Sequence, residues 1–173
     1  MTPIVHVGTA SPSDAGAIAD LSRRLIEHGL PWTWRPGRVA RAMASADTNV
    51  AVVREHDELV GFGIMKYGDE DAHLVLFAVR AWRQRQGVGR SILAWLEACA
   101  AVAGSSCIRV EARRDNVAAR SFVSSEMRPS TPHSANRVIS RALLTVQTKI
   151  CFLAEWSSAT RFSDTRLRLA MTA

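Results

Sequence analysis

The chain has 173 residues, 47% of them apolar and 22% charged, which suits a single globular domain large enough for a real core. No apolar run approaches the roughly eighteen residues of a membrane span, so no membrane partner is expected. The net charge of +6 is uneven: residues 1–127 carry 15 basic against 14 acidic side chains and residues 128–173 carry 7 against 2, so the body lacks the broad basic surface of a nucleic-acid-binding protein.

The first part of the chain predicts a short strand followed by a helix. Residues 4–7 have the alternation of a strand, and Ser11 with Asp14 three residues later is typical of a helix start. The helix is expected to end at Gly29. Its inward face is predicted to carry Ile18, Leu21 and Leu25.

The next segment predicts a connection, a short helix and a hairpin. The connection 30–37 is rich in proline and tryptophan, and a helix over 37–45 is predicted to turn Val39 and Met43 inward. Two runs of strand-forming residues around "EHDE" make 49–68 a predicted β-hairpin.

The rest of the body predicts two strands, each followed by a helix. Residues 72–79 are almost continuously apolar, which indicates a strand buried on both faces, and a helix from about 88 to 103 follows and ends at Gly104. Residues 107–113 alternate as a strand does, and 115–125 predict a helix. The predicted inward side chains are Val88, Ile92, Leu96 and Cys99 in the first of these helices, and Ala119 and Phe122 in the second.

The pattern fades after Met127. A strand over 138–146 is the clearest remaining signal, and 157–173 has no clear period. The predicted order is therefore β-α-α-β-β-β-α-β-α, followed by an end that the pattern does not define. Three widely spaced cysteines suggest neither a disulfide framework nor a zinc site. With neither a basic leader nor an apolar signal segment at the N-terminus, the cytoplasm is the expected location.

The stretch "QRQGVGR" at 84–90 stands between the apolar strand and the next helix, a position that suits an anion. Backbone amides at a helix start lack internal acceptors and carry partial positive charge, and glycine lets a phosphate approach them closely. The side chains of Arg83, Arg85 and Arg90 add positive charge. The stretch is either a diphosphate site or a tight turn with solvated arginines. It lacks the Gly-Lys-Ser/Thr end of a Walker loop and the third glycine of a dinucleotide fingerprint, where Ile92 stands.

The same stretch resembles the signature of the GNAT family of acetyl-coenzyme A-dependent N-acyltransferases, Gln/Arg-x-x-Gly-x-Gly/Ala between a central strand and a long helix. Here it reads Gln84-Arg85-Gln86-Gly87-Val88-Gly89. The apolar strand at 74–79 and the element order of 4–122 strengthen the likeness, as do Asn116, Ala119 and Phe122 at the family's Asn-x-x-Ala-x-x-Phe spacing. The resemblance implies an α/β (α+β) fold whose mixed central sheet is splayed at the middle and flanked by helices.

The resemblance also implies a site for acetyl-coenzyme A, the cosubstrate. Amides from Arg85 to Arg90 would hold the diphosphate, and backbone groups of Phe77 and Val79 would pair with the pantetheine arm and polarise the thioester carbonyl. Asn116 would contact the same arm, unless it only caps its helix. The predicted set is Phe77, Ala78, Val79, Gln84, Arg85, Gln86, Gly87, Val88, Gly89, Arg90 and Asn116, and no metal is implied.

A base must take a proton from the attacking amine. Four residues before Phe77, where histone-modifying members of the family carry a glutamate, this chain has His73, which titrates near pH 6.5 and can accept a proton at neutral pH. The alternatives are that Asp71 or Glu70 only satisfies this histidine, or that one of these acids serves instead. The tyrosine with which many members reprotonate the thiolate is Val123 here, so that role is absent or filled from elsewhere.

The acceptor amine is expected near the connection between the first two helices, as is usual in such folds. Trp34 and Tyr67 are the predicted substrate-binding residues, and Arg35 lies in the same connection. Two tryptophans can form an apolar or cation-recognising wall. Packing against the core is the competing interpretation for Tyr67 and is favoured for Trp32.

The chain departs from the family pattern after Phe122. Met127 and Arg128 stand where the family has Gly-Phe, and the excess of basic residues begins there. We interpret 1–127 as a GNAT acetyltransferase domain. Residues 128–173 are then a basic C-terminal segment that either completes the sheet by genuine divergence or results from a shift of the coding frame.

Together these features predict an N-acetyltransferase, an acyltransferase that moves groups other than aminoacyl groups, acting by direct attack of an amine of a small molecule or a protein. The implied partners are acetyl-coenzyme A and the amine, without nucleic acid, and a homodimer stays open. The alternative is a non-catalytic acyl-coenzyme A-binding module with a degenerate C-terminal half.

Overall fold

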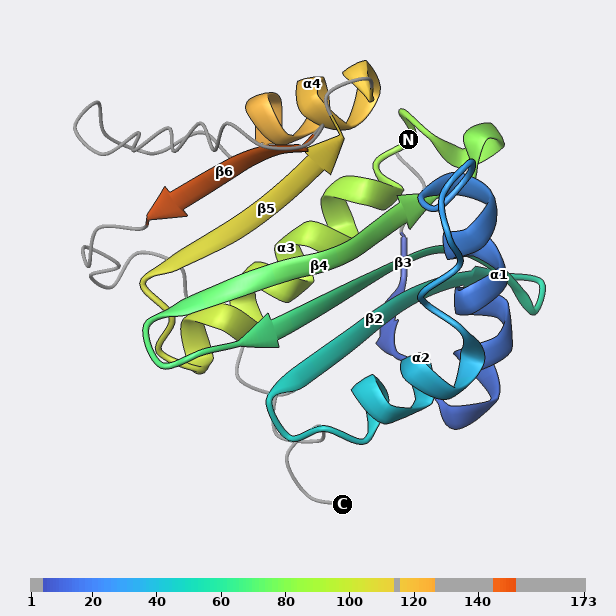
Figure 1. Ribbon diagram of the computed structural model, residues 1–173, viewed down its shortest axis with the longest axis horizontal. Helices are drawn as coiled ribbons and strands as arrows, with labels where there is room; N and C mark the ends of the chain where they lie inside the picture. Colours follow the sequence, from blue (N-terminus) through green and yellow to red (C-terminus); the bar gives the residue numbers. More distant parts are fainter. Residues whose placement is uncertain (1–4, 114–115, 127–144, 152–173) are drawn as a thin grey trace.

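Among the residues that the computed structural model describes, 5–113, 116–126 and 145–151, six strands form one sheet in the order β1-β2-β3-β4-β5-β6 (Figure 1). Neighbouring strands are antiparallel except β4 and β5, which run parallel. The elements are β1 (Val7–Thr9), η1 (Pro12–Asp14), α1 (Ala15–Leu25), α2 (Pro36–Met43), β2 (Thr48–Glu55), β3 (Glu58–Tyr67), β4 (Asp71–Val79), η2 (Ala81–Arg83), α3 (Val88–Val102), β5 (Cys107–Arg113), α4 (Val117–Glu126) and β6 (Thr145–Cys151). The predicted mixed α/β sheet flanked by helices is confirmed.

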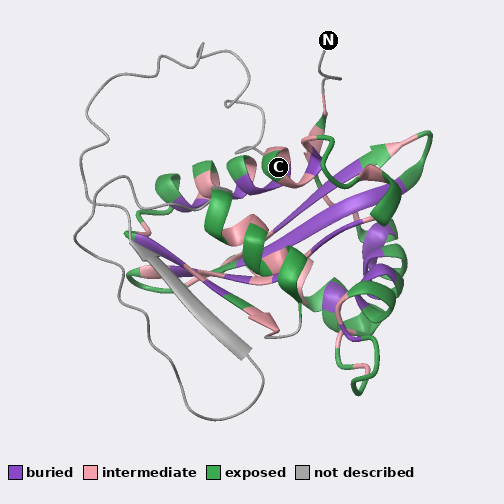
Figure 2. Ribbon diagram, turned by 90° about the horizontal axis from the view of Figure 1, so that it is seen from above, coloured by how far each residue is buried: buried purple, intermediate pink, exposed green. Residues whose placement is uncertain are grey.

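Helices cover both faces of the sheet, and each face has its own apolar cluster. α3 packs against one face, where Val88, Ile92 and Leu96 are fully buried, and α1 and α2 pack against the other, where Ile18 and Val39 are (Figure 1). We call these faces the α3 side and the α1/α2 side. Figure 2 shows α1 and α3 with both buried and exposed residues, whereas the described residues of α4 are only intermediate or exposed. Each fully buried side chain of this size contributes about 1.5–3 kcal/mol.

Two glycines of β3 let the start of α3 lie close to the sheet. A Cβ on Gly63 would lie 2.6 Å from Leu96 Cδ1 and 3.1 Å from Ile92 Cγ2, and a Cβ on Gly61 would lie 3.0 Å from Ile92 Cδ1. These distances are shorter than van der Waals contact, so a larger residue at either position would push the helix outward. Gly61 and Gly63 therefore set where the N-terminus of α3 stands.

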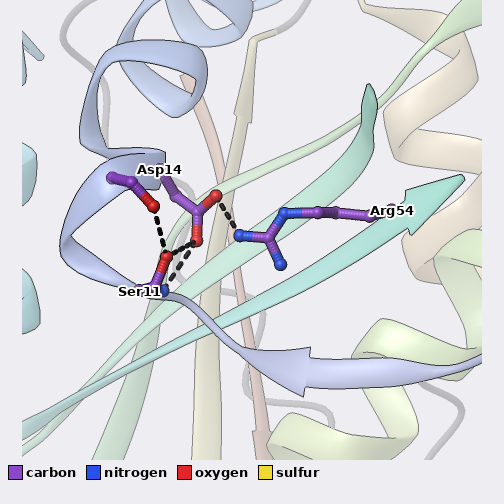
Figure 3. Close-up of polar contacts among 4 residues, drawn as sticks. Ser11, Asp14 and Arg54 are labelled. Carbon is purple, nitrogen blue, oxygen red and sulfur yellow. Dashed lines mark hydrogen bonds and ion pairs between the residues drawn. The ribbon is translucent and has the colours of Figure 1, made fainter. Parts of the chain in front are cut away.

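Asp14 holds the start of α1 to β2. Ser11 donates its backbone N–H and its hydroxyl to Asp14 Oδ2, at 2.6 and 3.0 Å, and Arg54 of β2 donates to Oδ1 (Figure 3). Burial opposes ionisation of this carboxyl, but the hydrogen bonds from Arg54 and Ser11 outweigh it and hold the pKa of Asp14 below its ordinary value. The predicted helix start thus also fixes α1, and the connection after it, on the sheet.

β4 carries a bulge at Val75, so alternate side chains before and after the bulge turn toward opposite faces of the sheet. The register with β3 leaves Val75 without a partner in that strand, so Leu74 before the bulge packs on the α3 side and Leu76 after it packs on the α1/α2 side. β4 contributes buried side chains to the apolar clusters of both faces, but His73, Val75 and Phe77 are only partly buried. This corrects the expectation of a strand buried on both faces.

The other differences from prediction lie at element ends. The first strand is Val7–Thr9 instead of 4–7, because its partners in β2 lie opposite Val7 to Thr9. α1 ends at Leu25, four residues before Gly29, because the chain turns there to bring Glu27 onto Ser22, with Ser22 Oγ 3.3 Å from Glu27 Oε2. Leu25 is consequently 40% exposed and does not face the core as predicted.

The end of the chain differs most. The strand beside β5 is Thr145–Cys151, and it overlaps the predicted strand 138–146 in its first two residues only. Antiparallel pairing with the whole of β5 fixes its position. Met127, Arg128, residues 138–144 and residues 157–173 lie outside the described residues.

Candidate active site

The parallel strands β4 and β5 pair only as far as Leu74 and then separate (Figure 1). Backbone groups of successive strand residues point to alternate sides, and the Arg80 N–H donates to a carbonyl of β3. The N–H groups of Phe77 and Val79 therefore point toward the side from which β5 has separated, while the N–H of Ala78 points toward β3. An extended ligand can pair with such an edge as an added strand would.

Side chains of the turn after β4 form hydrogen bonds that hold the turn in its conformation. Gln84 Nε2 donates to the carbonyl of Val79 at 3.0 Å, and Gln86 Nε2 donates to a backbone carbonyl of η2 at 2.8 Å. Arg83 binds Glu55 of β2 and Gln86 Oε1. The glutamines of the predicted site are therefore internal supports of the turn, which leaves its backbone for a ligand.

Most backbone N–H groups of this turn, unlike its glutamine side chains, find no acceptor among the described residues. Within the described part of the chain, each N–H from Arg85 to Gly89 lacks an acceptor, and the first bond of α3 runs from the Ser91 N–H to the Gly87 carbonyl at 2.9 Å. Arg85 and Gly87 have φ of 60° and 86°, left-handed values of the kind found in anion-binding turns. Arg90 follows in the first turn of α3. Amides at a helix start attract an anion, so this turn can hold a phosphate.

Gly89 brings the turn, β4 and α4 together. A Cβ on Gly89 would lie 3.4 Å from the rings of both Phe77 and Phe122, and these rings stack with centroids 5.4 Å apart. α4 begins after Asn116, whose Oδ1 accepts the Ala119 N–H at 2.9 Å. Asn116 is therefore the cap that the sequence offered as an alternative, and only its Nδ2 group is left to donate to a ligand.

His73 lies on the α1/α2 side, next to the place where β4 and β5 separate. Its Nε2 is 3.8 Å from Oε1 of Glu111 in β5, while Asp71 pairs with Arg109 at 2.5 Å. Burial lowers the pKa of His73 below its ordinary value, although Glu111 and Asp71 act to raise it, so the ring is neutral at neutral pH and can accept a proton. Of the two acids predicted beside the histidine, Glu70 bonds through its backbone carbonyl, which accepts the N–H and the hydroxyl of Ser106.

Sequence reasoning did not single out Glu111. The alternation of 107–113 puts Arg109 and Glu111 on one face of the strand, and that signal could have found it. What the sequence alone does not give is the neighbour of β5, which turns this face toward His73.

A pocket of about 890 Å³ lies on the α1/α2 side, between α2 and the strands. Its walls come from the α1–α2 connection, from α2, and from Ile64 and Lys66 of β3, and it reaches Val75 at the bulge of β4. Lys66 is the register partner of His73, so the histidine lies beside this pocket. The pocket can therefore receive an acceptor next to a base.

The structure brings one of the two predicted acceptor residues to the pocket. Trp34 and Arg35 line it, and Trp34 also packs against the α1/α2-side cluster, as Trp32 does without lining the pocket. Tyr67 lies on the α3 side, where its hydroxyl accepts a hydrogen bond from Asn49 Nδ2 at 2.9 Å and burial raises its pKa to about 12. Tyr67 therefore has the packing role that was its competing interpretation, and it does not line the pocket.

Val123, at the position of the family's tyrosine, packs against the α3-side cluster. Among the described residues, His, Cys, Asp and Glu side chains form no group of three that could hold a metal ion. None of the described helices has the length and apolar character needed to cross a membrane.

Comparison with known proteins places these features in context. The model of the acetyltransferase (GNAT) family matches residues 20–125, which include the turn, His73 and the pocket. A search of curated proteins finds no match.

Solved structures share the fold at low sequence identity. The PaiA N-acetyltransferase from Thermoplasma acidophilum, in complex with coenzyme A, has a TM-score of 0.71 and 11% identity, over 87% of this chain and 100% of that one. The ribosomal-protein-S18-alanine N-acetyltransferase from Escherichia coli has a TM-score of 0.62 and 18% identity, over 91% and 100%. Ard1 from Thermoplasma volcanium has a TM-score of 0.65 and 17% identity, over 86% and 98%.

Proposed function

Because this chain belongs to the acetyltransferase (GNAT) family, we propose that it transfers an acetyl group from acetyl-coenzyme A to an amine of a small molecule or a protein by direct attack. It is then an acyltransferase for groups other than aminoacyl groups. The observation that carries the proposal is the row of N–H groups from Arg85 to Gly89, which lack acceptors among the described residues and stand where β4 and β5 have separated. Residues 1–127 form the acetyltransferase domain in this proposal, and the basic segment 128–173 contributes β6, Thr145–Cys151, to its sheet.

Acetyl-coenzyme A binds as a substrate along two backbone surfaces. The N–H groups from Arg85 to Arg90 hold the diphosphate, helped by the charge of the exposed Arg85 side chain. The pantetheine arm pairs with the free edge of β4 at Phe77 and Val79, and Asn116 contacts it from the start of α4. No metal takes part.

The acetyl group passes directly to the acceptor. His73 takes a proton from the ammonium form of the acceptor, directly or through water, and the neutral nitrogen attacks the thioester carbonyl. An N–H of Phe77 or Val79 stabilises the negative charge that develops on the carbonyl oxygen. The C–S bond breaks as the new C–N bond is completed, the thiolate leaves, and the nitrogen gives its second proton to water. Since Val123 has no proton to give, water or protonated His73 supplies the proton to sulfur.

The proposed partners are acetyl-coenzyme A and the amine acceptor, and the proposed location is the cytoplasm. A homodimer stays a prediction from the sequence. The rival is a coenzyme A-binding module without catalysis, which the valine at position 123 favours.

The decisive experiment combines calorimetry with coenzyme A and release of its thiol from acetyl-coenzyme A across a panel of amines. We expect saturable binding at one site and thiol release that depends on the amine, with the acetyl group found on the acceptor by mass spectrometry. Binding without transfer to any amine would favour the non-catalytic rival. Absence of binding would reject both.

A further inference from the structure

The pocket beside His73 is strongly cationic. Its lining includes Arg35, Arg38, Arg41 and Lys66, and the described residues that line it include no Asp or Glu. Its volume of about 890 Å³ is in the range of small-molecule sites, roughly 300–1,000 Å³. Cationic side chains around a concave, low-dielectric wall produce a positive potential, which favours a ligand that carries negative charge.

The three arginines of this pocket are not neutralised by the described residues around them. Arg38 and Arg41 are three residues apart and share one side of α2, Arg35 directly precedes this helix, and Val39 faces the core. None of the three pairs with a carboxylate among the residues that the structure describes. Lys66 has Asp47 at 3.5 Å, but both side chains are well exposed, and such pairs are weak.

The wall that carries the arginines is held in place from inside. The buried carboxylate of Glu27 accepts the N–H of Thr33 at 2.7 Å and of Trp34 at 3.2 Å, and it also accepts the hydroxyls of Thr33 and Ser22. Arg38 lies over the Trp34 ring, with Cζ 4.3 Å from its centroid. A guanidinium stacked on a fixed ring keeps its N–H groups in one plane, which suits two-point binding of a carboxylate or phosphate.

The arginines of the pocket and its end near His73 lie on different walls. Its inner end reaches Val75, beside His73 and Glu111, and its outer wall is α2 with its arginines. We propose that the acceptor is a small amine whose other end carries an anionic group, a carboxylate or a phosphate, held by Arg38 and Arg41 while the amine lies at Val75. This inference rests on the proposed acetyl transfer and specifies its substrate class.

The test uses pairs of amines that differ by the anion alone. 4-Aminobutyrate is compared with propylamine, 6-aminohexanoate with pentylamine, and phosphoethanolamine with ethanolamine, and spermidine represents acceptors with several positive charges. We expect the anionic member to have a kcat/KM at least about tenfold higher, with a preference that shrinks as salt rises. The amino acids and phosphoethanolamine distinguish carboxylate from phosphate as the recognised group. Preference for the decarboxylated amines or spermidine, or transfer to peptides only, would overturn the proposal.

The matched variants are Arg38→Gln with Arg41→Gln, and Arg24→Gln as control. Arg24 lies on α1 with its side chain 71% exposed, outside the residues that line the pocket. The double variant is expected to lose most of the anion preference through KM, and the control to keep it. Retention of the preference in the double variant would contradict the assignment.

Calorimetry of the same pairs with the coenzyme A-bound protein separates the two proposals. If no amine is acetylated but the anionic members bind more tightly, the proposed function fails and the charge assignment stands. If amines are acetylated with no preference for the anionic members, the proposed function stands and the charge assignment fails. Equal binding of both members overturns the assignment whatever the activity.

Discussion

Two regions of this protein are suited to bind anions, and they are built in opposite ways. In the turn after β4 the side chains of Arg83, Gln84 and Gln86 bond within the protein, and the backbone N–H groups are left over. In the pocket beside α2 the backbone N–H groups of Thr33 and Trp34 donate to Glu27, and the arginine side chains have no carboxylate partner among the described residues. A backbone site survives most substitutions, whereas a side-chain site changes with each one. This difference suits a constant cosubstrate and an acceptor that varies among proteins of one fold.

The largest expected effect is at Gly87, in the backbone site. Gly87→Asp places a carboxylate among the N–H groups, and two like charges about 4 Å apart repel by roughly 4 kcal/mol at a protein surface, so coenzyme A affinity should fall about a hundredfold or more. Calorimetry measures this. Gly87→Asn is the matched variant, because asparagine has the same shape and also tolerates the left-handed φ of 86° at this position.

A second control lies at the other end of the same helix. Gly104 has φ of 80° and, like Gly87, would have nothing within 4 Å of an added Cβ. Gly104→Asp therefore introduces the same strain and charge far from the turn, and it should bind coenzyme A as the parent does. If Gly87→Asp and Gly87→Asn bind equally well, the diphosphate does not lie on these amides.

The next effect is at His73, which lies beside the pocket on the strand that leads to the turn. His73→Gln keeps a polar side chain but removes the base, and a positioned base contributes about 10²–10⁴-fold, so kcat should fall about a hundredfold with coenzyme A affinity preserved. Thiol-release kinetics at saturating acceptor measure it. A fall of less than threefold would show that another group takes the proton.

The sequence predicts the backbone site better than the side-chain site, and the reason is geometric. The turn is one contiguous segment, so the spacing of Gly87 and Gly89 after an apolar strand is enough to locate it. The pocket joins residues from four elements, and its inner end depends on the bulge at Val75, which an almost uniformly apolar strand does not reveal. The same holds for Glu111, whose position beside His73 follows from strand order.

Element ends were also harder to predict than elements, because partners decide them. The pairing of β1 with β2 moves the first strand to Val7–Thr9, and the buried contact of Glu27 with Ser22 ends α1 early. Neither partner is visible in the local pattern. The helix starts at Ser11 and Asn116 were predictable, since each is capped within its own first turn.

A smaller effect is expected at Glu27, which supports the side-chain site only. Glu27→Gln removes the charge from the acceptor of the part-buried Thr33 and Trp34 N–H groups, and hydrogen bonds to charged groups contribute about 1.5–3 kcal/mol. We expect a lower Tm and a KM for the acceptor raised several-fold, with coenzyme A affinity preserved. Glu70→Gln, in an exposed turn, is the control.

The pH dependence of this effect has a definite sign. Burial raises the pKa of Glu27, but the hydrogen bonds from Thr33, Trp34 and Ser22 outweigh it and hold the pKa below its ordinary value. Its contribution to stability is therefore present at neutral pH and is lost as pH falls through the lowered pKa. The Tm difference between parent and Glu27→Gln should narrow in acid, and a difference that widens there would contradict this assignment.

The smallest effect is expected from Glu111→Gln, which should shift the acid limb of the pH profile of kcat/KM. Burial and Arg109 lower the pKa of His73, and Glu111 and Asp71 raise it. Since a protonated ring cannot accept a proton, kcat/KM of the parent should fall as pH drops below the ordinary histidine value, near 6.5. Glu111→Gln removes a raising charge, so the limb should move to lower pH, and at mildly acidic pH the variant should keep a larger fraction of its own plateau rate. A limb that survives in His73→Gln and disappears in Glu111→Gln would instead make the glutamate the base.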